Sequence, residues 1–307
     1  MVNNSKIIVA GGSGFIGANL ISELISNGNE VISISRNEHQ IKRKVKNVKY
    51  ISHDLNKPLR KTFLEEFKEV EYIINCSGYI DHSDFRGNGR EVFYDHFNSL
   101  ISLTNLAIDL KVKTFVQLGS SDEYGNNKSP IKESIRESPI SPYALAKLSS
   151  TYFLQQCFKQ RILNTVILRP FLVFGEMQNK DRFLPYIIKN CIKDREFKVS
   201  KGDQIRDFLY VKDFNQALIK SLNNKKAYGE IINIASGVPI RIKDVISSVC
   251  ELIGKGKPIL GGIDYRENES MELYADINKA KLILDWAPKY DFHNSLKRVV
   301  KWYYDND

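Results

Sequence analysis

The chain has 307 residues, of which 42% are apolar and 26% are charged. This length supports a sizeable hydrophobic core, and the composition is that of a globular protein, so a disulfide-stapled miniprotein, a disordered chain, collagen and a coiled coil are excluded. Lysines and arginines number 45 and acids 36, which gives a formal net charge of +9. A surplus of this size fits an anionic ligand, a nucleic-acid partner or scattered solvated lysines, so charge alone does not select a function.

The N-terminus reaches glycines after one short apolar stretch, residues 7–10, which is too short for a signal peptide or a membrane span. No later uncharged apolar run is long enough to cross a bilayer. The four cysteines, Cys76, Cys157, Cys191 and Cys250, lie far apart and show no CxxC or His-rich ligand spacing. We therefore expect a cytoplasmic protein with reduced thiols and no bound metal, which does not associate with membranes.

Short apolar runs alternate with amphipathic segments through the first half of the chain, which is the pattern of βαβ units on a parallel sheet. The expected strands are residues 6–10, 30–34, 48–52, 72–76, 114–118 and 165–168. The expected crossover helices are residues 15–27, 59–67, 91–110 and 143–160. This pattern predicts an α/β fold with a Rossmann-type, doubly wound parallel sheet.

After Pro170 the regular alternation gives way to short mixed elements. Later helices are expected at residues 211–222, 242–253, 278–284 and 293–303. We expect residues 1–170 to form the NAD(P)-binding domain, with later residues adding strands to its sheet. Residues 171–307 are expected to form a smaller α/β substrate-binding region at the carboxyl edge of the sheet, where open α/β sheets bind ligands.

A glycine-rich loop, Gly11-Gly12-Ser13-Gly14-Phe15-Ile16-Gly17, lies between the first expected strand and the first expected helix. Gly11 permits a tight turn, Gly14 lets the backbone approach a pyrophosphate, and Gly17 allows the helix and strand to pack closely. The helix N-terminus adds amide N–H groups and the positive end of a dipole. The strand-loop-helix context favours a dinucleotide-binding loop over an ordinary glycine turn.

The end of the second expected strand bears on the choice of dinucleotide. Proteins that bind NAD usually hold the adenosine ribose there with an acid, but this chain has Ser35 and Arg36. Because a guanidinium fits a 2′-phosphate, NADP(H) is favoured over NAD(H). Alternatively, Arg36 only starts a basic loop that leads into residues 42–44. Asp54, after the third strand, is a candidate acceptor for the adenine amino group or a cap of the next helix.

Tyr143 and Lys147 stand four residues apart at the start of an expected helix, so their side chains share one face. A free tyrosine titrates near ~10, which is too high for an acid or base at neutral pH, and we expect a neighbouring ammonium to lower that pKa. Lys147 supplies this charge. Ser120, at the end of the fifth expected strand, is placed to hydrogen bond the oxygen whose carbon gains or loses a hydride. Many helices pair Tyr and Lys by chance, but the glycine loop and the strand-terminal serine favour a catalytic triad.

Several distinct motifs are spread along nearly the whole chain. They are AGGSGFIG at 10–17, GSSDEYG at 119–125, SPYALAK at 141–147, and segments at 168–175, 206–211, 228–237 and 275–286. Together they resemble the extended short-chain dehydrogenase/reductases, in the branch of nucleotide-sugar epimerases, dehydratases and 4-ketoreductases. The resemblance implies that Ser120, Tyr143 and Lys147 form the Ser-Tyr-Lys triad of that family.

The resemblance also implies the cofactor site. It places the pyrophosphate on Gly14, Phe15 and Ile16, and adenine near Asp54 and Leu55. It places the nicotinamide ribose against Cys76, Ser77, Gly78, Tyr143 and Lys147.

On the substrate side, Arg206 and Arg266 match arginines that contact a nucleotide diphosphate in this family. The match makes chemical sense because planar guanidinium groups pair bidentately with phosphate oxygens, although an isolated surface arginine is otherwise simply solvated. Ser121 and Asp122 fall where the dehydratases carry an Asp-Glu pair, so we expect both to face the substrate. His82 follows the fourth expected strand, where it is either a contact for sugar hydroxyls or a solvated loop residue.

The motifs separate the possible reactions. Ser121 stands in place of the dehydratase aspartate, which disfavours dehydration, although a one-residue shift in the alignment would restore that pair as Asp122 and Glu123. GSSDEYG resembles the motif of reductases acting on nucleotide-linked 4-keto-6-deoxy sugars. With Arg36, this favours NADPH-dependent reduction of a C4 keto group in deoxysugar or surface-polysaccharide (lipopolysaccharide) synthesis. The alternative is an NAD-dependent nucleotide-sugar C4 epimerase. Less favoured alternatives are a nucleotide-sugar 4,6-dehydratase and a non-catalytic dinucleotide-binding protein. Leu172 replaces an asparagine that touches the substrate in many relatives.

The expected partner is a nucleotide-sugar substrate. Nucleic acid is disfavoured because the densest basic stretch, residues 42–46, has no interleaved aromatic side chain. The resemblance implies a homodimer that packs two long helices from each subunit, here residues 91–110 and 143–160.

Overall fold

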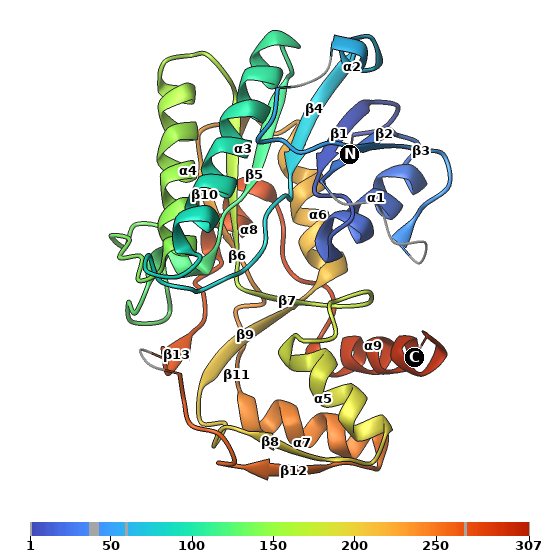
Figure 1. Cartoon of the computed structure of the whole chain (residues 1–307), viewed down its shortest axis with the longest axis vertical. Helices are drawn as coiled ribbons and strands as arrows, with labels where there is room; N and C mark the ends of the chain where they lie inside the picture. Colours follow the sequence, from blue (N-terminus) through green and yellow to red (C-terminus); the bar gives the residue numbers. More distant parts are fainter. Residues whose placement is uncertain (1, 37–42, 59–60, 267–268, 307) are drawn as a thin grey trace.

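The computed structural model describes residues 2–36, 43–58, 61–266 and 269–306. Its largest sheet has seven strands in the order β10-β6-β5-β4-β1-β2-β3, and every neighbouring pair is parallel. These strands are β1 (Lys6–Ala10), β2 (Glu30–Ser35), β3 (Val48–Ser52), β4 (Val70–Asn75), β5 (Thr114–Leu118), β6 (Thr165–Pro170) and β10 (Ile231–Ile234). The order confirms the predicted Rossmann-type, doubly wound parallel α/β sheet (Figure 1).

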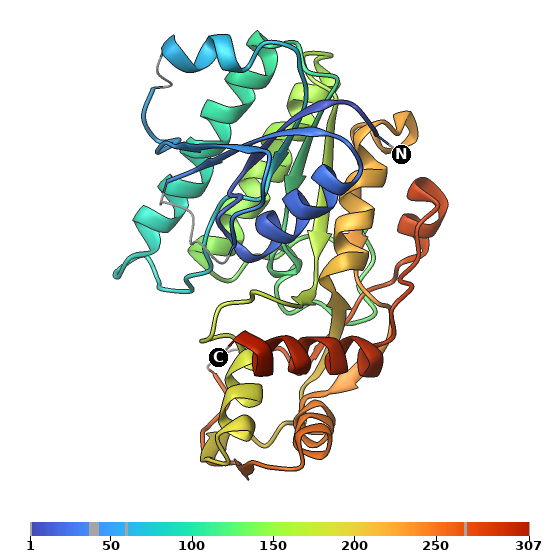
Figure 2. The ribbon, with the colours of Figure 1, turned by 90° about the vertical axis from the view of Figure 1, so that its right-hand side faces the viewer.

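Helices cover both faces of this sheet (Figure 2). One face carries α1 (Phe15–Ser26), α6 (Val211–Leu222) and α8 (Asn278–Leu284), and the other carries α2 (Lys61–Glu66), α3 (Gly89–Asp109) and α4 (Pro142–Lys159). Alternate residues of β1 enter the two cores: Ile7 and Val9 pack on one side, and Ile8 and Ala10 on the other. Because both faces are covered, such strands are continuous apolar runs in the sequence.

A second lobe lies beyond the carboxyl edge of the sheet (Figure 1). Its strands are β7 (Leu172–Phe174), β8 (Glu196–Val199), β9 (Ile205–Tyr210), β11 (Pro239–Arg241), β12 (Lys257–Leu260) and β13 (Glu272–Leu273). β9 pairs with β7, β11 and β13, while β8 and β12 form a separate parallel pair. The helices α5 (Phe183–Ile192), α7 (Ile242–Ile253) and α9 (Phe292–Asn306) pack with these strands around one apolar core.

The chain after Pro170 contributes to both parts of the molecule. β10 pairs with β6 at the end of the large sheet, and α6 and α8 cover one of its faces. A short 3-10 helix, η3 (Lys225–Ala227), precedes β10. The lobe at the carboxyl edge is therefore built from the remaining later segments.

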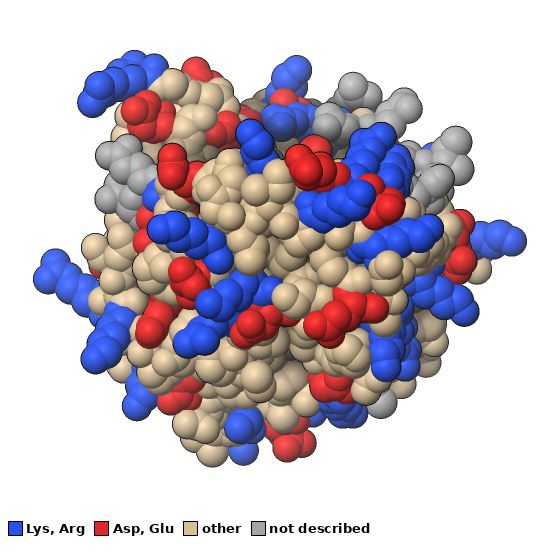
Figure 3. Space-filling model, turned by 90° about the horizontal axis from the view of Figure 1, so that it is seen from below, with Lys and Arg blue, Asp and Glu red and all other residues tan. Residues whose placement is uncertain are grey.

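In the described part of the chain, no helix is both long and apolar enough to cross a bilayer. Lysines, arginines and acids are interspersed over the face shown in Figure 3. On this face, basic and acidic side chains therefore lie next to one another.

Candidate active site

The glycine loop forms a close-fitting cradle at the carboxyl end of β1. Gly11 has a φ of 79°, and a Cβ there would lie 2.7 Å from the Cys76 backbone. A Cβ on Gly17 would lie 2.4 Å from the Gly11 carbonyl oxygen, and Gly14 is the N-cap of α1. The loop backbone can therefore approach a pyrophosphate at a helix N-terminus, so the residues present fit a bound dinucleotide.

A cavity opens from this loop along the carboxyl ends of β1 to β4. Its walls include the predicted cofactor residues Gly11, Gly14, Ser35, Arg36, Asp54, Leu55, Cys76, Ser77 and Gly78. Phe15, Ile16 and Gly17 form the first turn of α1, next to the loop. The residues predicted from four separate segments thus meet at one edge of the sheet. Burial raises the pKa of the Cys76 thiol to about 12, so this residue lines the cavity as a neutral thiol.

At the adenosine end of this cavity, Arg36 has an acidic partner that the sequence did not indicate. Its Nη1 lies 3.0 Å from Asp95 Oδ2 on α3, so a 2′-phosphate there would meet a guanidinium that is already paired. Asn56 also donates to Asp95, at 2.7 Å. Asp54 accepts the backbone N–H of Asn56 at 3.1 Å, which closes a turn after β3. No motif identified Asp95, since it lies within an otherwise ordinary amphipathic helix.

The predicted triad residues lie together at the ends of β5 and α4. Ser120 precedes the 3-10 helix η2 (Ser121–Tyr124), and its hydroxyl accepts the Asp122 N–H at 3.1 Å. Tyr143 lies in the first turn of α4, and Lys147 follows one turn later. Lys147 Nζ donates to the Leu118 carbonyl at 3.0 Å and lies 5.9 Å from the centre of the Tyr143 ring. All three triad side chains are buried.

The pKa of Tyr143 departs from the sequence-based expectation. Burial raises the pKa of Tyr143, the negative charge of Asp122 raises it further, and the Ser120 side chain opposes this rise. The predicted lowering is wrong for this structure because burial of the phenol, the largest influence, raises the pKa. Burial lowers the pKa of Lys147 itself to about 8. Tyr143 is therefore a neutral phenol in this structure.

Two histidines flank the Tyr143 ring edge-on. The His82 ring centre lies 5.8 Å from that of Tyr143, and the His96 ring centre 5.3 Å. Burial lowers the pKa of His96 to about 3, so this imidazole is neutral. His82 Nε2 lies 3.9 Å from Asp122 Oδ2, so His82 lies next to both Tyr143 and Asp122.

Arginines from three segments act on the charge of Asp122. Burial raises the pKa of the Asp122 carboxyl, and His82, Arg182, Arg206 and Arg266 oppose that rise in this order. The predicted residues Asp122, His82, Arg206 and Arg266 therefore share one electrostatic neighbourhood. Arg182, the N-cap of α5, was missed because no motif surrounds it.

Arg206 has partners within the protein. It forms an ion pair with Glu269 and donates to the Ile205 carbonyl at 2.8 Å. Burial lowers the pKa of Arg206, and Glu269 opposes that change. A diphosphate at this place would have to compete with Glu269 for the guanidinium. Ser121 is buried in the first position of η2, and Arg266 is exposed.

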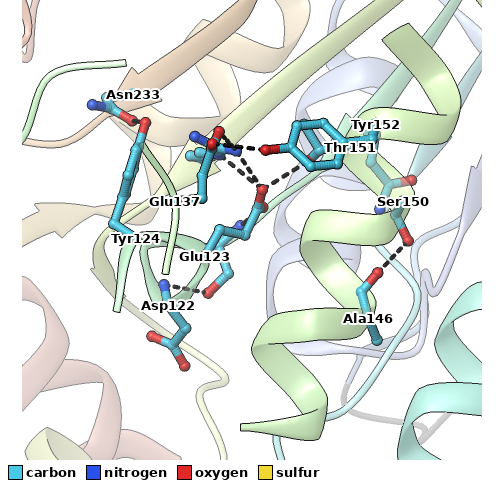
Figure 4. Close-up of polar contacts among 12 residues, drawn as sticks. Asp122, Glu123, Tyr124, Glu137, Ala146, Ser150, Thr151, Tyr152 and Asn233 are labelled. Carbon is cyan, nitrogen blue, oxygen red and sulfur yellow. Dashed lines mark hydrogen bonds and ion pairs between the residues drawn. The ribbon is translucent and has the colours of Figure 1, made fainter. Parts of the chain in front are cut away.

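A buried charge network lies behind Ser120, and Figure 4 shows most of its members. Glu123 accepts the Ser120 N–H through Oε1 at 2.8 Å and the Thr151 hydroxyl through Oε2 at 2.8 Å. Arg169 lies 2.6 Å from the same Oε2 and 2.8 Å from Glu137, and its side chain is fully buried. Glu123 thereby connects the loop of Ser120 with the helix that carries Tyr143 and Lys147.

Further contacts anchor this network to its surroundings. Tyr152 on α4 donates to Glu137 at 2.9 Å, and Arg169 lies over the Tyr124 ring at 4.4 Å. Tyr124 donates to Asn233 on β10 at 2.7 Å (Figure 4). Among the described residues, no group of three His, Cys, Asp or Glu side chains is arranged to hold a metal ion.

The fold and the cradle can now be compared with known proteins. A model of the NAD dependent epimerase/dehydratase family matches residues 7–235. The chain belongs to this family. The match confirms the resemblance to the extended short-chain dehydrogenase/reductases, and the protein is an enzyme of the epimerase/dehydratase family.

Relatives in the epimerase/dehydratase family match the whole chain. The UDP-glucuronate 4-epimerase of Thermodesulfobacterium geofontis is 27% identical over 314 residues, which cover 97% of this chain and 96% of the relative. The structure of the UDP-glucose 4-epimerase of Thermotoga maritima, solved with UDP-glucose, has a TM-score of 0.90 at 23% identity and covers 98% of this chain and 99% of that one.

A third relative was solved with a cofactor. The UDP-glucuronic acid 4-epimerase of Bacillus cereus, in complex with UDP-glucuronic acid and NAD, has a TM-score of 0.88 at 23% identity and covers 98% of this chain and 99% of that one. These comparisons favour the predicted alternative, an epimerase, over the predicted 4-ketoreductase. They give no support for a preference for NADP(H).

Proposed function

We propose that this enzyme is a nucleotide-sugar 4-epimerase that uses a bound nicotinamide dinucleotide. The main support is the position of Tyr143 against His96, which lines the cavity of the glycine loop, in a chain whose relatives include 4-epimerases. Ser120 and Lys147 lie near Tyr143. The substrate class is a nucleoside diphosphate sugar with a hydroxyl at C4.

The chain's own residues supply the proton chemistry. A bound nicotinamide dinucleotide would supply the acceptor, and later the donor, of the hydride at C4 of the sugar. Tyr143 exchanges a proton with the C4 oxygen in both half-reactions, and Ser120 orients that oxygen by a hydrogen bond. Lys147 contributes a positive charge that favours the Tyr143 phenolate, the form that accepts the proton of the C4 hydroxyl. Burial of all three side chains excludes water and strengthens these interactions.

The arginines near Asp122 are the proposed diphosphate site. Arg206, Arg266 and Arg182 act on the charge of Asp122 from β9, the loop before β13 and the start of α5. Guanidinium groups bind phosphate oxygens bidentately, so this grouping suits a diphosphate. We assign Asp122 and His82 to the sugar, with Ser121 beside them, because Asp122 and His82 lie next to Tyr143.

A second candidate function is NADPH-dependent reduction of a nucleotide-linked 4-keto-6-deoxy sugar. One observation favours it: β2 ends in Ser35 and continues with Arg36, where an acid is usual in proteins that bind NAD. In that reaction Tyr143 protonates the new alkoxide, and its raised pKa suits a proton donor.

The two candidate functions are distinguished by the cofactor that the purified protein contains and by the reaction that it catalyses. Purified protein should release NAD on denaturation and interconvert C4 epimers of UDP-glucose, UDP-glucuronic acid or UDP-N-acetylglucosamine without added cofactor. Tyr143→Phe should lower kcat by at least about a hundredfold, because general acid–base catalysis contributes about that factor or more. Tyr304→Phe, on the exposed end of α9, is the matched control and should retain full activity.

Other outcomes identify the second candidate or reject both. Stoichiometric oxidation of added NADPH with 4-keto-6-deoxy sugars, and no epimer exchange, would identify a ketoreductase. Epimerisation that survives Tyr143→Phe unchanged would contradict the role of the triad. We also propose that the enzyme is a homodimer that associates through α3 and α4. Within one chain these two helices pack side by side, with the ring centres of Phe97 and Phe153 5.9 Å apart.

A further inference from the structure

β2 ends without the acid that is usual in proteins that bind NAD, but Asp95 on another element lies beside Arg36. Asp95 lies on α3, and its side chain lines the dinucleotide cavity together with His96 and Ser99. We propose that Asp95 selects NAD(H) over NADP(H), by holding Arg36 and by disfavouring a 2′-phosphate. The inference rests on the proposed dinucleotide-dependent function and adds the residue that decides between its two cofactors.

Donors from three loops hold the Asp95 carboxylate. Arg36 Nη1 lies 3.0 Å from Oδ2, the Tyr79 hydroxyl lies 3.3 Å from the same oxygen, and Asn56 Nδ2 donates to Oδ1 at 2.7 Å. These donors follow β2, β4 and β3, so the carboxyl ends of three strands converge on one acid. An ionised carboxylate has about four acceptor positions, so Asp95 can still accept a hydroxyl of the adenosine ribose.

The ion pair changes what Arg36 offers to a cofactor. The side chains of Arg36 and Asp95 are 50% and 24% exposed, so the pair lies where water weakens its charge interactions without abolishing them. A 2′-phosphate brings about two negative charges and must either displace Asp95 from Arg36 or lie beside its carboxylate. A dinucleotide without that phosphate meets a neutral pair.

Arg43 is held elsewhere. Its guanidinium donates to the Ser13 carbonyl at 2.8 Å, to the Met177 carbonyl at 2.6 Å and to Asn179 Oδ1 at 2.9 Å. These bonds fasten the glycine loop to the segment after β7. Arg43 therefore serves the structure of the loop, and Arg36 is the arginine whose pairing bears on the cofactor.

The test measures binding of the two cofactors. Full-length protein is freed of dinucleotide, and dissociation constants for NAD⁺ and NADP⁺ are measured by calorimetry for the wild type and for Asp95→Asn. We expect the wild type to prefer NAD⁺ and the variant to shift the ratio of constants toward NADP⁺ by about tenfold, the effect of one charge at a partly exposed site. The shift should shrink when the salt concentration is raised, because salt screens charge interactions.

Three further variants keep the outcome interpretable. Asp109→Asn removes an exposed acid from the far end of α3 and should leave the ratio unchanged. Arg36→Met should weaken NADP⁺ further and spare NAD⁺. The double variant Arg36→Met/Asp95→Asn should lose the gain in NADP⁺ affinity.

Several results would overturn the inference. A wild type that prefers NADP⁺ would do so, as would an Asp95→Asn variant that weakens both cofactors equally or shifts the ratio independently of salt. Binding with the expected preference but no epimerisation would instead reject the proposed function and leave the role of Asp95 standing. A wild type that binds neither dinucleotide would reject both.

Discussion

Glu123 is fully buried and accepts the Ser120 N–H, so we propose that it positions the triad. One carboxylate oxygen holds the Ser120 N–H, and the other holds Thr151 and Arg169. Its negative charge also opposes the burial that lowers the pKa of Lys147 to about 8. We therefore expect the residue to act on the proposed catalysis through both the geometry of Ser120 and the charge of Lys147.

Glu123→Gln should change the pH profile of the enzyme. Without the nearby negative charge, the pKa of Lys147 falls below about 8, so Lys147 loses its proton at lower pH and the alkaline limb of kcat moves to lower pH. We also expect a loss of about 3 kcal/mol in the free energy of unfolding, because Arg169 loses a buried charged partner. Rate profiles and chemical denaturation measure the two effects.

Glu137→Gln is the matched control for that prediction. Glu137 also pairs with Arg169, at 2.8 Å, but it does not contact Ser120 and is not among the charges acting on Lys147. This variant should lose stability while keeping the alkaline limb in place. Equal movement of the limb in both variants would show that loss of stability alone alters the profile.

Residue spacing predicted some parts of the site and not others. Tyr143 and Lys147 are four positions apart on one helix, so the sequence alone places them together. Glu123 and Arg169 are 46 residues apart, and Arg36 and Asp95 are 59 residues apart. Such pairs meet only because parallel strands bring their ends to one edge, and no local pattern records which side chains then face each other.

At the scale of elements, the start of α4 determines where Tyr143 lies. Ser141 is the N-cap, its hydroxyl accepts the Ala144 N–H at 3.1 Å, and Pro142 occupies the first turn. Ser141→Ala removes this cap and should cost about 1 kcal/mol of unfolding free energy. It should also lower kcat, because the first turn that carries Tyr143 frays.

Ser141→Asp separates capping from other effects of the hydroxyl. Aspartate is an equally good N-cap, so this variant should keep most of the stability and activity that Ser141→Ala loses. Thermal unfolding and steady-state rates compare the two variants. Equal losses in both would show that the serine acts through something other than the cap.

The elements of the first half were predictable because each buried strand is an apolar run between glycine or polar turns. The second lobe was not predictable in the same way. β13 has two residues and β7 three, so neither is long enough to show the alternation of apolar and polar residues that indicates a strand. α5 has no side-chain cap and carries Pro185 in its first turn, so its start resembles a loop in the sequence.

At the scale of the whole molecule, the proposed dimer depends on the outer surface of α3 and α4, which lie side by side at one edge of the fold (Figure 1). Apolar side chains recur every seven residues on α3, at Tyr94, Ile101 and Ile108, and Tyr94 is 59% exposed. On α4, Leu145 and Tyr152 have the same spacing and are 37% and 51% exposed. Two such helix pairs related by a twofold axis would bury these side chains against their own copies.

Sedimentation equilibrium should give the mass of two chains for the wild type. Tyr94→Arg combined with Leu145→Arg should give the mass of one chain, because charges buried without partners at an apolar interface are costly. Leu282→Arg changes a more exposed leucine, 79% exposed on α8, and should leave the dimer intact. A wild type with the mass of one chain, or a dimer that survives the double substitution, would place the association elsewhere. Since Tyr143 and Lys147 lie on α4, dissociation should also lower kcat by loosening the helix that carries them.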